Sequence, residues 1–113
     1  MFEAQYLLEG ATVYGPWVAR GGDNLLFTAD LVSLSDGKLE VRVYHKALED
    51  EGDGVSVGPT LVATAVGQSA RITKGLKDLV RYQYKSVSTA GSPTDIDRVL
   101  FRMLTPVWFD AVQ

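Results

Sequence analysis

The sequence predicts an all-β fold, namely an antiparallel β-sandwich or jelly roll of about seven to nine short strands. Val, Ile, Thr, Phe, Trp and Tyr make up 35 of the 113 residues, and these side chains suit the pleated surface of a sheet. Turn signals recur about every 8–12 residues along the chain, as in sandwiches. Neither a long amphipathic helix nor an internal repeat of fixed period is visible, which disfavours helical and solenoid folds.

Length and composition limit the classes of protein further. A chain of 113 residues is expected to form one domain, residues 1–113. Hydrophobic residues make up 46% and charged residues 22%, which excludes wholesale disorder. The chain has no cysteine, so disulfides, thiolate catalysis, iron–sulfur clusters and cysteine-ligated zinc are excluded. We expect no cofactor.

The first half of the chain contains several expected strands. They occupy residues 5–9, 11–20, 25–34 and 39–46. Gly15-Pro16 interrupts the second of these, because proline cannot donate a hydrogen bond to a sheet ladder. Asp36-Gly37 predicts a hairpin turn between its flanking strands. The last strand alternates most regularly and directs Leu39, Val41, Val43 and His45 to one buried face.

Four further strand regions are expected in the second half. They are residues 55–67, divided into two pieces at Gly58-Pro59, then 68–74, 79–87 and 98–104. The aromatic tail at residues 107–110 is expected to dock or pair. The expected core combines alternating residues of these regions: Phe27, Leu31, Leu39, Val41, Val43, Val80, Tyr82, Tyr84, Val99, Phe101 and Met103.

Charge is distributed unevenly along the chain. The net charge is −3, but residues 1–70 carry −6 and residues 71–102 carry +4. Such asymmetry can steer one copy onto another or onto an anionic partner, although a solvated surface also produces it. The overall negative charge argues against bulk nucleic-acid binding.

The sequence offers no pattern typical of catalysis. His45 is the only histidine, and it belongs to the apolar face of its expected strand. No serine or threonine lies in a nucleophile-elbow context, and no phosphate-binding glycine loop occurs. We therefore predict that the protein is not an enzyme and assign no catalytic residue.

Two sets of residues are candidates for binding. Tyr6, Tyr14, Trp17 and Trp108 lie near proline or glycine breaks, where exposed rings could stack on sugars. The alternative is core and edge packing, since tryptophan is usually largely buried. A basic stripe arises if residues 39–46 and 79–87 are neighbouring strands. Its members would be Arg42, Lys46, Arg81 and Lys85, with Tyr44 and Gln83 between them.

An acidic segment follows the most regular strand. Glu49, Glu51 and Asp53 alternate before a glycine, which resembles the start of a calcium loop. The position where a loop-closing glutamate should stand is Thr60, so this is a weak calcium candidate. The alternative is a solvated hairpin tip. We predict no other metal site.

These observations predict a non-catalytic structural or accessory subunit that acts through its surface, most simply as a homo-oligomer. A component of a phage-type or other particle is one setting for such a subunit. The alternative is a carbohydrate-binding module that uses exposed Trp and Tyr residues. Residues 1–5 lack the features of a signal peptide, and no run of 18 apolar residues occurs, so we expect neither export by a signal peptide nor a membrane span. The compartment is not indicated, and both synthesis in the cytoplasm and association with a particle fit the sequence.

Overall fold

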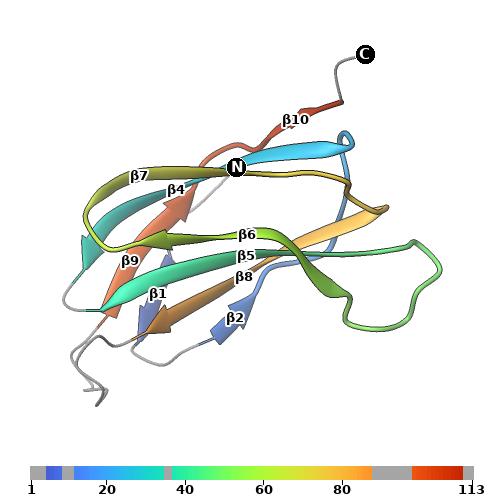
Figure 1. Cartoon of the computed structure of the whole chain (residues 1–113). Coiled ribbons are helices and arrows are strands. Elements are labelled where there is room, and N and C mark those ends of the chain that lie inside the picture. Colours follow the sequence, from blue (N-terminus) through green and yellow to red (C-terminus); the bar gives the residue numbers. More distant parts are fainter. Residues whose placement is uncertain (1–4, 9–11, 35–36, 88–97, 111–113) are drawn as a thin grey trace.

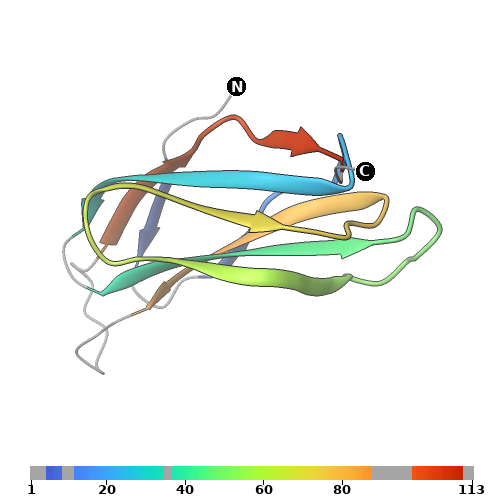
Figure 2. The same cartoon turned by 45° about the horizontal axis from the view of Figure 1, so that its top comes forward.

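The computed structural model describes residues 5–8, 12–34, 37–87 and 98–110. Within these residues the chain forms ten strands and no helix. The strands make two antiparallel sheets that lie one above the other (Figures 1 and 2), which confirms the predicted all-β sandwich. Their bounds are β1 Gln5–Leu8, β2 Thr12–Tyr14, β3 Val18–Ala19, β4 Asn24–Leu34, β5 Lys38–Lys46, β6 Val55–Ala63, β7 Gly67–Thr73, β8 Leu79–Val87, β9 Arg98–Met103 and β10 Val107–Phe109.

Each sheet has four strand positions, and in each sheet one of these positions is filled by a pair of short strands. Strands β9 and β10 pair with different parts of β4, while β7 pairs along the other edge of β4. Strands β2 and β3 pair with different parts of β8. Sheet A is therefore β1, β9/β10, β4 and β7, and sheet B is β2/β3, β8, β5 and β6. These interruptions raise the number of strands to ten, above the expected seven to nine.

The order of pairing identifies the sandwich as a jelly roll. Strand β5 pairs with β6, β4 with β7, β2/β3 with β8, and β1 with β9. Along the sequence, each of these strand pairs encloses the previous one, so the chain forms one long antiparallel hairpin. This hairpin is folded so that successive strand pairs lie in alternate sheets. This winding is the jelly-roll topology. The tip of the long hairpin, residues 47–54, projects beyond one end of the sandwich (Figures 1 and 2).

The core lies between the two sheets and follows the predicted alternation. In β5, Leu39, Val41, Val43 and His45 are buried, as expected. All residues of the expected core are buried except Tyr82, which packs partly buried against the others. The sequence analysis did not include the remaining core members: Leu25, Ala29, Leu61, Ala63 and Leu76.

Two local expectations were wrong. The segment around Asp36-Gly37 does not close a hairpin, because β4 and β5 belong to different sheets. Gly37 adopts a positive φ of 85°, and Asp36 lies outside the described residues. Gly58-Pro59 does not divide β6, because the strand continues through a register shift opposite Arg42. Gly58 has φ of 73°, and a Cβ there would lie 2.8 Å from Thr73 Oγ1.

The aromatic tail pairs with the sheet, as predicted. Strand β10 pairs with β4, with Trp108 opposite Leu25. The Trp108 side chain packs against the core, and its ring lies over Gly21, where a Cβ would come within 2.6 Å of Trp108 Cγ.

The first prediction concerns this core. Phe101 is fully buried and contacts the Tyr84 ring, with the ring centroids 5.2 Å apart. Phe101→Ala should lower the free energy of unfolding by about 3–5 kcal/mol, because it removes apolar contacts and leaves a cavity. Urea unfolding would measure this loss. Val66→Ala, at a side chain that is 67% exposed, is the control and should change the stability by less than about 0.5 kcal/mol. Equal unfolding curves for the two variants would contradict the assignment of the core.

Candidate functional site

The outer face of sheet B collects aromatic and cationic side chains from three strand positions. Strands β5 and β8 pair directly, so the two halves of the predicted basic stripe are neighbours. Tyr14 in β2 lies opposite Gln83, which lies opposite Arg42 in β5. We call this surface the cation–aromatic face and define it by eight residues: Tyr14, Trp17, Arg42, Tyr44, Lys46, Arg81, Gln83 and Lys85.

Rings and cations alternate in one row across this face. The Arg81 guanidinium lies 4.4 Å from the centroid of the Tyr14 ring and 4.5 Å from that of Trp17. The Lys46 ammonium lies 4.6 Å from the Trp17 centroid. Contacts of this kind stabilise a cation by about 0.5–2 kcal/mol, depending on solvent exposure. The row keeps the four side chains of Tyr14, Arg81, Trp17 and Lys46 in defined positions.

The break at Gly15-Pro16 and the hairpin tip together position Trp17. Because the chain interrupts its pairing with β8 between β2 and β3, Trp17 is released from the sheet register and lies over Arg81. Gly54 of the tip approaches the ring closely, with φ of 76°, and a Cβ there would lie 2.8 Å from the indole. Trp17 is consequently half-buried, whereas Tyr14 is 46% exposed. Tyr14 therefore offers the most accessible ring of the face.

A buried amide lies at the centre of the face. Gln83 is only 8% exposed, because Tyr14, Tyr44 and Arg42 surround it. Its Nε2 donates to the Tyr14 hydroxyl at 2.9 Å and to the Tyr44 hydroxyl at 3.3 Å. Its Oε1 accepts a longer contact of 3.5 Å from Arg42 Nη1. A buried polar group with all its atoms engaged has a single favoured orientation, so the two tyrosine hydroxyls are held in fixed places.

Among the described strand residues of sheet B, one carries a carboxylate, namely Glu40. Glu40 pairs with Arg42 at 3.0 Å and with Lys38 at 3.4 Å. Burial alone would raise the pKa of Glu40, but the hydrogen bonds and charges of Arg42 and Lys38 outweigh this effect and lower it. Among the described residues, Lys46, Arg81 and Lys85 have no carboxylate partner. The face is therefore electropositive.

The other predicted site residues lie elsewhere. Trp108 belongs to sheet A and is covered by Gly21. Tyr6 lies in β1 at the edge of sheet A, opposite Leu100, and its side chain is outside the described residues. Of the four predicted aromatic candidates, the structure brings together only Tyr14 and Trp17, and it places them beside the predicted basic stripe.

The weak calcium candidates Glu49, Glu51 and Asp53 are exposed at the tip of the hairpin. Lys46 Nζ donates to the carbonyl of Gly52 at 3.0 Å, and Arg81 Nη2 donates to that of Asp53 at 3.3 Å. No group of three or more potential metal ligands occurs in the described part of the chain. The tip thus contacts the cation–aromatic face through its backbone, while its carboxylates point to solvent.

Gln83 and Tyr44 complete the face, and the sequence analysis treated them only as neighbours of the basic residues. No pattern in a single sequence indicates that a glutamine on the polar side of an alternating strand is buried. Its burial depends on rings from β2 and β5, which are distant from it along the chain.

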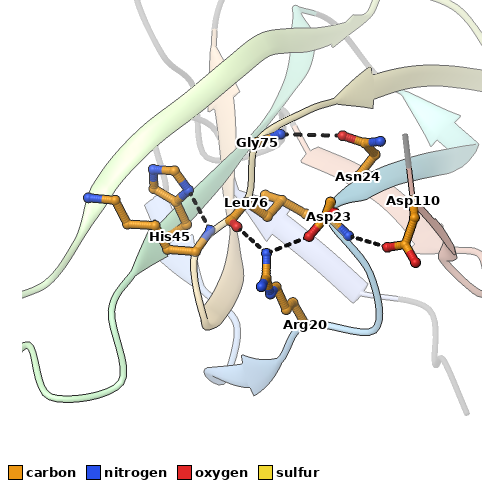
Figure 3. A network of polar contacts seen from close by, with 8 residues as sticks. Arg20, Asp23, Asn24, His45, Gly75, Leu76 and Asp110 are labelled. Atoms are coloured by element: carbon orange, nitrogen blue, oxygen red, sulfur yellow. Dashed lines mark hydrogen bonds and ion pairs between the residues drawn. The ribbon is translucent and has the colours of Figure 1, made fainter. Parts of the chain in front are cut away.

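A second polar cluster joins the loops at the end of the sandwich where the hairpin projects (Figure 3). Arg20 Nη1 donates to Asp23 Oδ1 at 3.0 Å and to the Leu76 carbonyl at 2.6 Å. Nearby, Asp110 accepts from the Asp23 amide and Asn24 from the Gly75 amide. These residues border an open hollow, and three of their hydrogen bonds join residues 20–24 to residues 75–76 and to Asp110. The cluster therefore serves to hold the loops together.

His45 takes part in this cluster, and the geometry gives it a structural role. The Lys77 amide donates to His45 Nδ1 at 3.2 Å, so the ring is neutral with its proton on Nε2. The side chain is 7% exposed. Burial, together with the charge of Lys77, lowers the pKa of His45 below its ordinary value of 6.5.

Searches of protein-family models, curated proteins and solved structures found no match to this chain. None of the described residues belongs to a helix that is long and apolar enough to cross a membrane. The function must therefore be argued from the geometry of the surface.

The second prediction follows from His45. Because the folded state lowers its pKa, the unfolded state binds the proton first as the pH falls below about 6.5. The melting temperature should therefore decrease between pH 7.5 and pH 5.5, a range that lies above the titration of ordinary carboxyl groups. His45→Gln is the control, since it removes the titrating ring and should flatten this decrease. An unchanged slope in that variant would show that other groups cause the pH dependence.

Proposed function

We propose that this protein is a non-catalytic binding module that acts through the cation–aromatic face, with carbohydrate as its ligand. The observation that supports this most directly is the grouping of Tyr14, Tyr44 and Gln83 on an open sheet face. Sugar rings carry apolar C–H faces that pack on aromatic rings, and their hydroxyls bond to planar polar side chains. Sites for small ligands in general combine aromatic walls with a few polar groups in fixed positions.

The preorganisation of the face favours a binding role over a merely solvated surface. An ordinary outer sheet face carries long side chains that move independently in water. Here the Gln83 amide is buried, and Arg81 is held between two rings and a backbone carbonyl. Groups that are already ordered lose less conformational entropy when a ligand binds.

The third prediction tests carbohydrate binding. A panel of neutral and acidic oligosaccharides would be titrated against the full chain by calorimetry, with Trp17 emission as a second signal. We expect at least one class to bind, and Tyr14→Ala should weaken that binding by about tenfold or more. Val107→Ala is the control, because Val107 is 52% exposed on sheet A. Equal binding by the Tyr14 and Val107 variants, or no binding by any sugar, would reject the proposal.

Self-assembly as a structural or accessory subunit is the second candidate function, and a feature of the opposite sheet favours it. On the outer face of sheet A, Val107, Leu26 and Ile72 lie side by side on three adjacent strands. Ile72 is 45% exposed and Val107 is 52% exposed. Adjacent exposed apolar residues favour contact with another protein surface, and a second copy is the simplest partner. Assembly by edge pairing of sheet B is hindered by Pro16 and Pro59.

The fourth prediction concerns the mass in solution. Light scattering coupled to size-exclusion chromatography should give a molecular mass that is a multiple of the 12.3 kDa chain. The mass should be the same at low and high salt, because salt does not screen an apolar contact. Ile72→Glu should shift the mass towards the monomer. Gln68→Glu, on the same side of the same strand, is the matched control and should not do so. A monomeric parent protein at millimolar concentration would remove this candidate. An oligomer that dissociates in high salt would indicate instead a charge contact between the acidic tip and the basic face.

A further inference from the structure

The hydrogen bonds around Gln83 determine where the tyrosine protons point. Both hydrogens of the Gln83 amide are directed at phenolic oxygens, those of Tyr14 and Tyr44. Arg42 Nη1 lies 3.5 Å from Gln83 Oε1, which disfavours the flipped amide, since that would set two donors against each other. Because both phenolic oxygens accept from Gln83, each hydroxyl hydrogen is directed away from it. The hydroxyls of Tyr14 and Tyr44 are therefore two neighbouring O–H donors, and both accept from Gln83 Nε2.

Among the described residues, the amide, carboxylate and tip carbonyl acceptors near these donors already have partners. Gln83 Oε1 is engaged by Arg42, and Glu40 by Arg42 and Lys38. The carbonyls of the hairpin tip near Trp17 are engaged by Lys46 and Arg81. A neutral sugar brings hydroxyl groups that need acceptors as well as donors, and this face offers it mainly donors.

Positive charge adds to this preference. Arg81 and Lys85 flank Gln83 on β8, and neither has a carboxylate partner in the described part of the chain. An anionic oxygen accepts several hydrogen bonds at once and carries the complementary charge. Hydroxyl and guanidinium donors in this arrangement match a carboxylate.

From this geometry we propose that the ligand is an acidic saccharide, whose carboxylate accepts from the Tyr14 and Tyr44 hydroxyls and is attracted by Arg81. The sugar ring then packs on the exposed face of Tyr14. This inference rests on the proposed carbohydrate binding and names the class of sugar. The carboxylates of the acidic tip of a second copy share this chemistry, and the test includes them as a separate arm.

The experiment compares sugars that differ only in charge. Oligomers of galacturonate, glucuronate and mannuronate would each be titrated against the full chain beside their methyl esters. We expect at least one acid to bind about tenfold more tightly than its ester, and this difference should shrink at high salt. A synthetic peptide of residues 47–54 is the further arm, and its tighter binding would assign the site to self-association and overturn the proposal.

Two variants distinguish the contribution of the tyrosine hydroxyls to binding from that of the aromatic rings and of the overall charge. Tyr14→Phe combined with Tyr44→Phe keeps both rings and the charge of Arg81 but removes the hydroxyl donors, so the preference for the acid over its ester should shrink severalfold. Lys74→Glu is the control for charge, because Lys74 is exposed on a loop away from the face, and the preference for the acid should persist. If acid and ester bind equally to the parent protein, the acidic class is wrong while carbohydrate binding stands. If neither binds, both proposals fail.

Discussion

The pairing of β5 with β8 is the constraint on which the rest of the structure depends. The two strands pair over nine residues each, from Lys38 opposite Val87 to Lys46 opposite Leu79. On one side this register places Val41 against Tyr84 and Val43 against Tyr82, which forms the centre of the core. On the other side it places Tyr44 against Arg81 and Arg42 against Gln83. A shift by one residue would exchange the two faces, so the core also specifies the register of the cation–aromatic face.

The jelly-roll winding then adds the third element of the face. Residues 12–19 reach β8 only because the long hairpin folds over itself and brings its early and late parts together. Tyr14 pairs beside Gln83, and the proline break frees Trp17 to cover Arg81. The hairpin tip follows the C-terminal end of β5 and approaches the same surface, where its Gly54 lies against the indole of Trp17. Three segments that are distant in sequence thus build one surface: residues 12–19, β5 with the adjoining tip, and β8.

The cations of this face are stabilised without neutralising carboxylates. Lys46 and Arg81 interact with aromatic rings and with backbone carbonyls of the tip, which are dipoles and carry no net charge. Such partners orient a cation but leave its long-range field in place. The four acidic residues of the tip lie nearby and point to solvent. The result is a surface whose positive potential remains available to a ligand, next to a hairpin of opposite sign.

The sequence by itself determined the all-β class, the core faces of β5 and β8, and the two alternating halves of the basic stripe. These follow from local patterns, because a period of two residues sends side chains to opposite sides of a strand wherever that strand lies. Only the tertiary structure decided that β4 and β5 belong to different sheets, that β6 continues through Gly58-Pro59, and that Gln83 is buried on an outer face. Each of these depends on which strand lies next to which. A pairing between segments far apart in the chain is decided by the packing of the whole core, so no local pattern in a single sequence encodes it.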